Sequence, residues 1–122
     1  MSLESQIGLG VDAMGISLPD GAIDRLAQYL RLLEKWNRVH NLTAIREPEM
    51  MVALHVLDSL SVLPHLAGAR TLVDVGTGAG LPGIPLAIAR PELRVTLLDS
   101  SHKKATFLEQ ARVELGLGNI AV

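Results

Sequence analysis

The spacing of hydrophobic residues divides this chain into a helical first half and a mixed second half. The stretch from Met1 to Gly15 has mixed character and predicts a short helix or a loose terminus. Beyond it, apolar residues recur every three or four positions, as in an amphipathic helix. These positions are Ile23, Leu26, Ala27, Leu30, Leu33 and Trp36. Ser17 is the expected N-cap, Pro19 lies in the expected first turn, and the helix should end near Asn41.

A second helix is predicted after a short connector over residues 41–46. Pro48 occupies the position of a first helical residue, and Pro64 should stop the helix. The expected stripe is Met50, Met51, Leu54, Leu57 and either Leu60 or Ser61.

His55 and Asp58 lie three residues apart on this second helix and therefore share a face. They could form a metal pair, a catalytic or substrate-side pair, or a surface hydrogen bond that braces the loop above. No third ligand accompanies them, which disfavours a metal. Bracing is the favoured interpretation, and a role toward the substrate remains open.

From Arg70 onward, short apolar runs alternate with glycine and proline, which predicts strands alternating with helices. The expected elements are strands at 70–75 and 94–99, helices at about 82–90 and 102–115, and a strand that begins at Asn119. Ser101 is the expected N-cap of the last helix.

This order predicts an α/β protein whose sheet follows a helical extension. We expect the extension at residues 1–66 and the first part of a nucleotide-binding domain at residues 67–122. Two or three strands make a poor sheet, so we expect the chain to be truncated after the start of its third strand. Unpaired strand edges would then favour self-association of this chain.

The composition is that of a soluble globular protein, because 48% of the residues are hydrophobic and 20% are charged. No apolar run is long enough for a membrane span, and the first ten residues lack a signal-peptide pattern. The absence of cysteine fits a reducing cytoplasm. A net charge of -2 means that any contact with nucleic acid must come from a local basic patch.

The glycine-rich stretch from Asp74 to Gly83 is the strongest chemical signal. Residues 78–83 match G-x-G-x-x-G, the dinucleotide fingerprint. However, Asp74 would place a negative charge near a pyrophosphate, and Pro82 and Pro85 remove N–H donors where it would bind. S-adenosylmethionine suits these features better, because it has no phosphate and carries an ammonium and a sulfonium. A tight turn without a ligand is the third alternative.

Asp99 ends the second predicted strand and is placed to accept hydrogen bonds from ribose hydroxyls. Both a dinucleotide and S-adenosylmethionine carry a ribose, so this residue does not discriminate between them.

Basic residues gather at two places. Lys35, Arg38, His40 and Arg46 surround the connector, and His102, Lys103 and Lys104 follow the second strand. Such clusters are commonly solvated faces, but the second one lies beside the presumed ligand edge. It is therefore the better candidate for contact with phosphate.

Several motifs, in their order along the chain, resemble the bacterial small-subunit ribosomal RNA guanine-N7 methyltransferase G family, also called glucose-inhibited division protein B. The motifs are Lys35-Trp36-Asn37, Asn41-Leu42-Thr43, His55-Val56-Leu57-Asp58-Ser59, the stretch from Asp74 to Leu86, and Leu97-Leu98-Asp99-Ser100 with Lys103-Lys104 and Phe107-Leu108. The resemblance implies a class I, Rossmann-like methyltransferase fold with an N-terminal helical extension. It also implies S-adenosylmethionine as donor and a guanine in 16S rRNA as acceptor.

The resemblance also carries site residues onto this sequence. It implies donor contacts at Asp74, Gly76, Gly78, Gly80 and Leu81, with Asp99 on the ribose side. Lys103 and Lys104 match a basic pair that would face RNA, and Arg46 and His55 are further candidates for RNA contact.

No catalytic residue and no metal are expected, because guanine N7 has a free lone pair and no proton to lose. The expected partner is 16S rRNA or the small ribosomal subunit, without a membrane. An NAD-dependent oxidoreductase and a non-catalytic fragment of the methyltransferase remain the alternatives.

Overall fold

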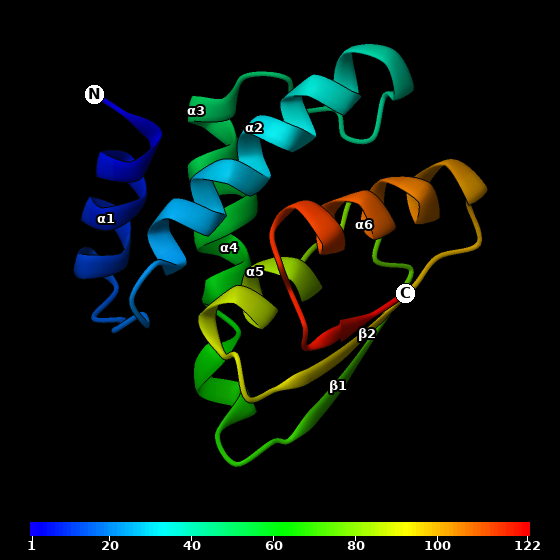
Figure 1. Ribbon diagram of the computed structural model, residues 1–122. Helices are drawn as coiled ribbons and strands as arrows, with labels where there is room; N and C mark the ends of the chain where they lie inside the picture. Colours follow the sequence, from blue (N-terminus) through cyan, green and yellow to red (C-terminus); the bar gives the residue numbers. More distant parts are fainter.

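The computed structural model describes residues 1–122, with helices in the first half of the chain and a parallel sheet in the second (Figure 1). The α-helices are α1 (Leu3–Ala13), α2 (Ala22–His40), α3 (Pro48–Met51), α4 (Asp58–Leu60), α5 (Gly83–Ala89) and α6 (His102–Glu114). A π-helical segment, η1 (Val52–Leu57), joins α3 to α4, and a short 3-10 turn, η2 (Leu63–Leu66), follows. The strands are β1 (Thr71–Val75), β2 (Arg94–Leu98) and β3 (Ile120–Ala121).

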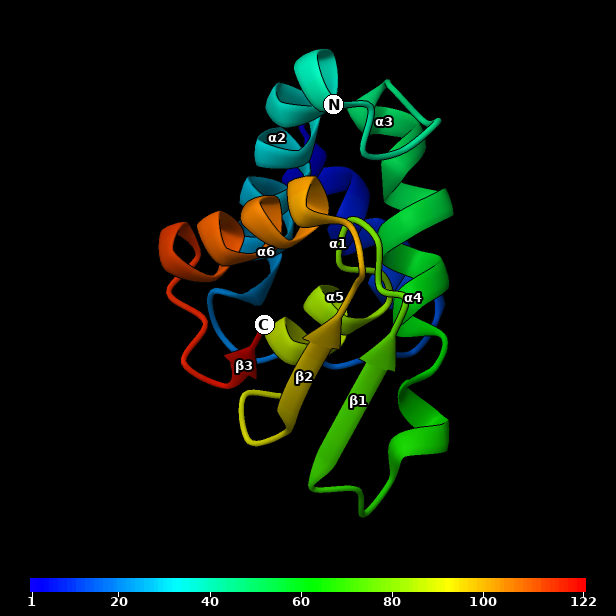
Figure 2. The same cartoon turned by 90° about the vertical axis from the view of Figure 1, so that its right-hand side faces the viewer.

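The sheet has the order β1-β2-β3, and both strand pairs are parallel. Val75 pairs with Leu98, so β1 and β2 end side by side, and Figure 2 shows their arrowheads at one end of the sheet. This βαβαβ arrangement confirms the predicted α/β, Rossmann-like class. The ends of β1 and β2 form the edge at which open α/β sheets bind ligands.

Helices α5 and α6 lie on one face of the sheet (Figures 1 and 2). Val95 and Leu97 of β2 are buried toward that side. Val73, Val75 and Leu98 alternate with the covered positions and are exposed. This face of the sheet therefore exposes three apolar side chains beside Thr71, Arg94 and Thr96, and self-association remains a prediction.

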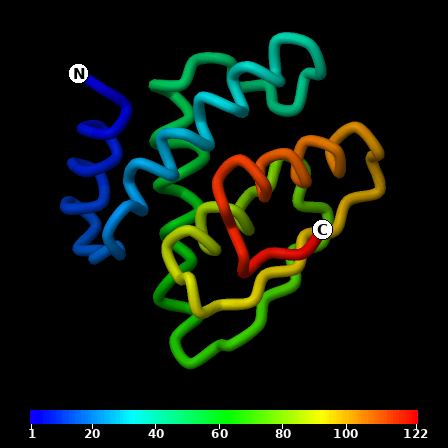
Figure 3. Tube along the Cα trace, viewed as in Figure 1, coloured from blue at the N-terminus to red at the C-terminus, as the bar shows by residue number.

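One hydrophobic core joins both halves of the chain. It contains 30 buried residues, from Ile7 in α1 to Ile120 in β3. Helix α2 contacts α1 and α3 as well as α5 and α6, and the trace in Figure 3 shows it passing across the molecule between α1 and α6. A helical extension at residues 1–66 remains a prediction about domain boundaries, but its residues share their core with the sheet. No helix combines the length and the apolar character needed to cross a bilayer.

The predicted start of the long helix is wrong. Helix α2 begins at Ala22, and its N-cap is Gly21 with a φ of 81°, whereas Ser17 lies in the connector. Gly15 also adopts a positive φ, of 69°, so two left-handed glycines reverse the chain before the helix can form. The N-terminal stretch does form a helix, whose N-cap Ser2 accepts a hydrogen bond from the Ser5 N–H.

The second helix begins at Pro48 as predicted, but part of its expected apolar stripe is wrong. Met50 and Leu54 are about half exposed, whereas Val52 and Val56 are buried. For Leu54 the reason is η1, because a π-helical turn holds more residues than an α-helical turn and rotates the following side chains. Met50 lies before this segment, in the short helix α3. Spacing rules based on 3.6 residues per turn do not anticipate this rotation.

Asn119 clamps the sheet to the end of α5. Its Nδ2 lies 2.8 Å from the carbonyl oxygen of Leu93, 3.1 Å from that of Ala87 and 3.2 Å from that of Arg90. We expect Asn119→Ala to lower the free energy of unfolding by about 1–3 kcal/mol, because it removes the amide that donates to these carbonyls, of which only that of Arg90 also accepts from the Leu93 N–H. Asn119→Asp should cost more, because a carboxylate would face the same oxygens. Urea denaturation measures both, and an alanine variant as stable as the native chain would contradict the clamp.

Candidate functional site: the glycine loop after the first strand

The glycine loop, residues 76–82, connects β1 to α5 at the ligand-binding edge of the sheet. Gly76, Gly78 and Gly80 all have positive φ angles, of 71°, 62° and 97°. This backbone shape explains the alternating glycines, because other residues rarely adopt it.

The glycines of the loop have two different roles. A Cβ built on Gly76 or Gly78 would meet no atom within 4 Å, so their backbone is bare and open. A Cβ on Gly80 would collide with Ile84 and come within 3.1 Å of Leu108. Gly76 and Gly78 therefore offer surface to a ligand, whereas Gly80 allows the loop to pack on α5 and α6.

Asp74 holds both ends of the glycine loop. Its Oδ2 accepts a hydrogen bond of 2.6 Å from the Thr77 hydroxyl and one of 2.9 Å from the Gly83 N–H. Thr77 is buried and Asp74 is half-buried. The carboxylate thus ties the end of β1 to the start of α5, and Oδ1 remains for an outside donor.

Asp99 connects the loop to α6. Its Oδ2 accepts from the Gly78 N–H and its Oδ1 from the Ser101 N–H, both at 2.8 Å. These hydrogen bonds to backbone N–H groups, that from Ser101 first, lower the pKa of the Asp99 carboxyl. Ser101 caps α6 by accepting from the Lys104 N–H, as the sequence predicts.

A surface cavity of about 450 Å³ lies beside Asp99 and is bordered by Leu97, Leu98, His102 and Ala105 among others. Each Asp99 oxygen has a second lone pair, so the carboxylate can still accept a hydroxyl from a ligand in this cavity.

Most N–H groups of the glycine loop are already used inside the protein. Those of Gly76 and Thr77 donate to the Leu98 carbonyl, and those of Gly80 and Leu81 donate to the Thr77 carbonyl. Gly78 and Gly83 donate to the two aspartates described above. A pyrophosphate is held by free N–H groups at a helix start. This loop lacks such a set, which argues against a dinucleotide.

Tyr29 supports the loop from below, and sequence reasoning missed it. Its hydroxyl donates a hydrogen bond of 2.8 Å to the Ala79 carbonyl, and its side chain is fully buried. Burial, and secondarily the Asp74 carboxylate, raises the pKa of Tyr29 far above its usual value, so the group remains a neutral donor. Its position next to the predicted apolar stripe of α2 indicated that Tyr29 would be buried, but it did not indicate the hydrogen bond to Ala79.

Removal of the Tyr29 hydroxyl tests how much its hydrogen bond to the Ala79 carbonyl stabilises the protein. We expect Tyr29→Phe to lower the free energy of unfolding by about 1–3 kcal/mol, because the buried Ala79 carbonyl loses its partner. Thermal or urea unfolding measures the change. Leu32→Ile, on the same helix away from this bond, is a control for repacking. An unchanged stability of Tyr29→Phe would show that the bond contributes nothing.

The connector after α2 is fixed by side chains rather than by regular structure. Asn37 is buried, and its Oδ1 accepts from the Thr43 N–H at 2.9 Å. Thr43 Oγ1 in turn forms a 2.9 Å hydrogen bond with His55 Nε2. His55 thus braces the connector, which is one of the three interpretations of the sequence. Its hydrogen-bond partner is Thr43 and not Asp58.

The environment of His55 lowers the pKa of its ring below the usual value of 6.5, chiefly through burial. Folding therefore disfavours the protonated ring, and stability should fall as the pH drops from about 7 to 5. An NMR titration of the His55 ring should give a midpoint below 6.5, and His55→Gln should flatten this part of the pH dependence of unfolding. A midpoint at or above 6.5 would contradict the burial argument.

Comparison with known proteins identifies the family. The model of a family described as rRNA small subunit methyltransferase G matches residues 22–122. The chain belongs to the rRNA small subunit methyltransferase G family. A protein of Nitrosospira multiformis named "Ribosomal RNA small subunit methyltransferase G" is 62% identical over 122 residues, which is 100% of this chain and 56% of that protein.

Two further relatives carry the same name. The protein of Chromobacterium violaceum is 53% identical over 118 residues, which is 97% of this chain and 56% of the relative. That of Neisseria meningitidis serogroup B is 49% identical over 122 residues, which is 100% of this chain and 59% of the relative. The chain therefore spans 56–59% of the length of these relatives, and this family member corresponds to part of each.

The predicted RNA-contacting residues of this family member lie on three elements, namely α6 (Lys103 and Lys104), the connector (Arg46) and η1 (His55). Lys103 and Lys104 lie in the first turn of α6, one exposed and one half-buried. Arg46 is exposed in the connector and donates to the Asn41 side chain at 3.2 Å. Helix α2, which precedes the connector, packs on α6 through Trp36, whose ring lies edge-on to that of Phe107 at 5.6 Å. Trp36 is thus part of the core packing, as expected.

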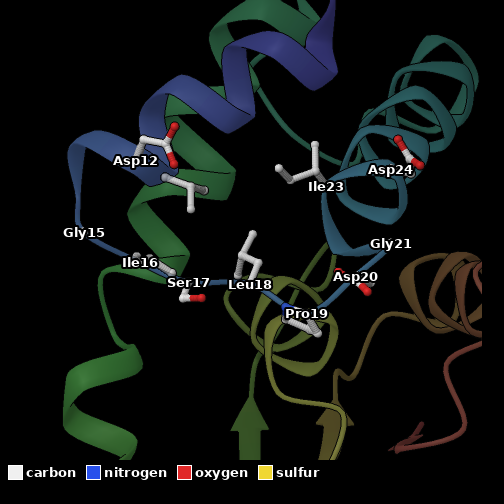
Figure 4. Close-up of a pocket in the computed structure, with 11 residues that line it drawn as sticks. Asp12, Gly15, Ile16, Ser17, Leu18, Pro19, Asp20, Gly21, Ile23 and Asp24 are labelled. Atoms are coloured by element: carbon white, nitrogen blue, oxygen red, sulfur yellow. The ribbon is translucent and has the colours of Figure 1, made fainter.

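A larger hollow, of about 580 Å³, lies elsewhere, along the connector between α1 and α2 (Figure 4). Asp12, Asp20 and Asp24 stand around it, and no residue of the glycine loop lines it. It has no basic side chain for an anion. Its size alone does not make it the functional site.

Proposed function

We propose that this chain carries the S-adenosylmethionine-binding part of a methyltransferase that modifies N7 of a guanine in 16S rRNA. The observation that carries the proposal is the glycine loop, which presents bare backbone at Gly76 and Gly78 while its N–H groups are engaged internally. Such a surface accepts a ligand through close approach and not through phosphate binding. The family membership supports the same class of reaction.

The residues at the sheet edge fit this donor. Asp99 can accept the ribose hydroxyls beside a cavity of about 450 Å³, and Oδ1 of Asp74 can accept from the ammonium group. Gly78 is tied to Asp99, so the open backbone and the ribose acceptor are held in one arrangement. When bound, S-adenosylmethionine supplies an electrophilic methyl group.

The acceptor chemistry requires little from side chains. Guanine N7 has a lone pair in the ring plane and no proton to release, so the protein needs no general base. Its residues have to orient the base and exclude water. The relatives' printed name supports small-subunit rRNA as the substrate. Lys103, Lys104 and Arg46 are the proposed contacts with its phosphates, and an rRNA substrate would place the protein in the cytoplasm.

The donor is tested by calorimetric titration with S-adenosylmethionine, with NAD as control. Gly76→Arg should abolish binding of the donor, because the side chain would occupy the space above the loop. Gly68→Arg is the matched control: Gly68 also has a positive φ, of 81°, and open surroundings, but lies before β1. We expect it to bind as the native protein does. Asp74→Ala should also abolish binding, because the loop loses its brace.

The outcomes separate the alternatives. Selective binding of NAD would overturn the proposal in favour of an oxidoreductase. Equal loss in both arginine variants would show that backbone strain, and not the position in the glycine loop, causes the effect. Binding of neither ligand by this chain, but of S-adenosylmethionine by a longer form, would make the chain a structural fragment of the donor site.

A further inference from the structure

A further cavity borders the glycine loop itself. It measures about 290 Å³ and is lined by Leu54, His55, Asp58, Ser59, Val62, Leu81 and Pro82. Leu81 and Pro82 belong to the glycine loop, whereas the other residues come from η1, α4 and the turn after them. Figure 2 shows the helical segment that contains α4 beside β1, on the side away from β2.

We propose that this cavity holds the acceptor guanine, with Asp58 as the residue that recognises its Watson–Crick edge. The inference rests on the proposed function and assigns its substrate pocket. A volume of about 290 Å³ lies at the lower end of small-molecule sites, roughly 300 Å³, which suits a single unstacked base. A base bound there would lie against the same loop that presents Gly76 and Gly78.

The chemistry of the lining matches a purine. Leu54, Val62, Leu81 and Pro82 provide apolar surface for the ring, and Leu54 is half exposed, which is unusual for a leucine in a core helix. His55 is held by Thr43, so one wall of the cavity is fixed. A cavity that combines a fixed wall, apolar surface and a few polar groups is typical of a ligand site.

The acidic group in this lining is the carboxylate of Asp58. It is exposed and makes no ion pair within the protein, unlike the acids that pair with Arg31, Arg38 and Arg112. Guanine offers two parallel donors, N1–H and the N2 amino group, and a carboxylate accepts both. Adenine offers one donor and one acceptor on that edge. N7 lies on the opposite edge of guanine and therefore remains free.

The π-helical segment explains why these groups face the loop. It rotates the helix so that Val52 and Val56 enter the core, while Leu54, His55 and Asp58 border the cavity. Interruptions of this type are frequent at functional sites. Here the interruption converts part of the expected core stripe into the lining of a cavity.

The experiment measures methyl transfer to small-subunit rRNA by the full-length protein, after the modified guanine has been mapped. Asp58→Asn should lower kcat/KM for RNA about 10- to 100-fold, because one of its two acceptors becomes a donor. The affinity for S-adenosylmethionine should stay within twofold of the native value, which also confirms folding. Glu49→Gln, an exposed acid of α3 that does not line the cavity, is the matched control and should leave both quantities unchanged.

A second arm replaces the acceptor guanine by inosine, which lacks the N2 amino group. Inosine should reduce kcat/KM for the native protein. It should cause little further loss in Asp58→Asn, because that variant has already lost the contact between the Asp58 carboxylate and the N2 amino group. An equal loss in both proteins would overturn the assignment of Asp58. So would native activity of Asp58→Asn, or loss of its donor binding. If the native protein binds the donor but methylates no guanine, the proposed function itself fails, whatever Asp58 does.

Discussion

The hydrogen bonds to the Asp74 carboxylate are the constraint on which the functional end of this molecule depends. One oxygen holds the Thr77 hydroxyl and the Gly83 N–H, so the strand, the turn and the next helix are joined at one atom. The loop between them is therefore shaped by the protein and not by its ligand. With its N–H groups largely engaged, what it offers outward is bare glycine backbone, and this decides which ligands it can accept.

The helical half of the chain belongs to the same structure as the sheet. Tyr29 reaches from α2 to the Ala79 carbonyl inside the loop, and Trp36 of the same helix packs on Phe107 of α6. These contacts are buried or partly buried, so disturbing α2 changes the support of both the loop and α6. The helices thus supply rigidity to the glycine loop, and η1 supplies a wall to the cavity bordered by Leu81 and Pro82.

The spacing of residues along the chain predicted those features that depend only on neighbouring residues. The 3.6-residue period placed α2 up to His40, and the apolar runs placed β1 and β2 to within a residue. Ser101 was recognised as a cap because capping depends on neighbours three residues away. The same reasoning failed at Ser17, where two left-handed glycines delay the helix, and at Leu54, where a π-helical turn rotates the stripe.

The sequence by itself determined the α/β order, the glycine loop between its two aspartates, and the resemblance to the methyltransferase family. Each of these is written in contiguous residues, whose spacing reflects backbone geometry directly. Only the tertiary structure decided that Gly78 is open whereas Gly80 is a packing residue, and that Tyr29 and Thr43 bind partners far along the chain. Such contacts depend on which elements fold against each other, and no local period encodes them.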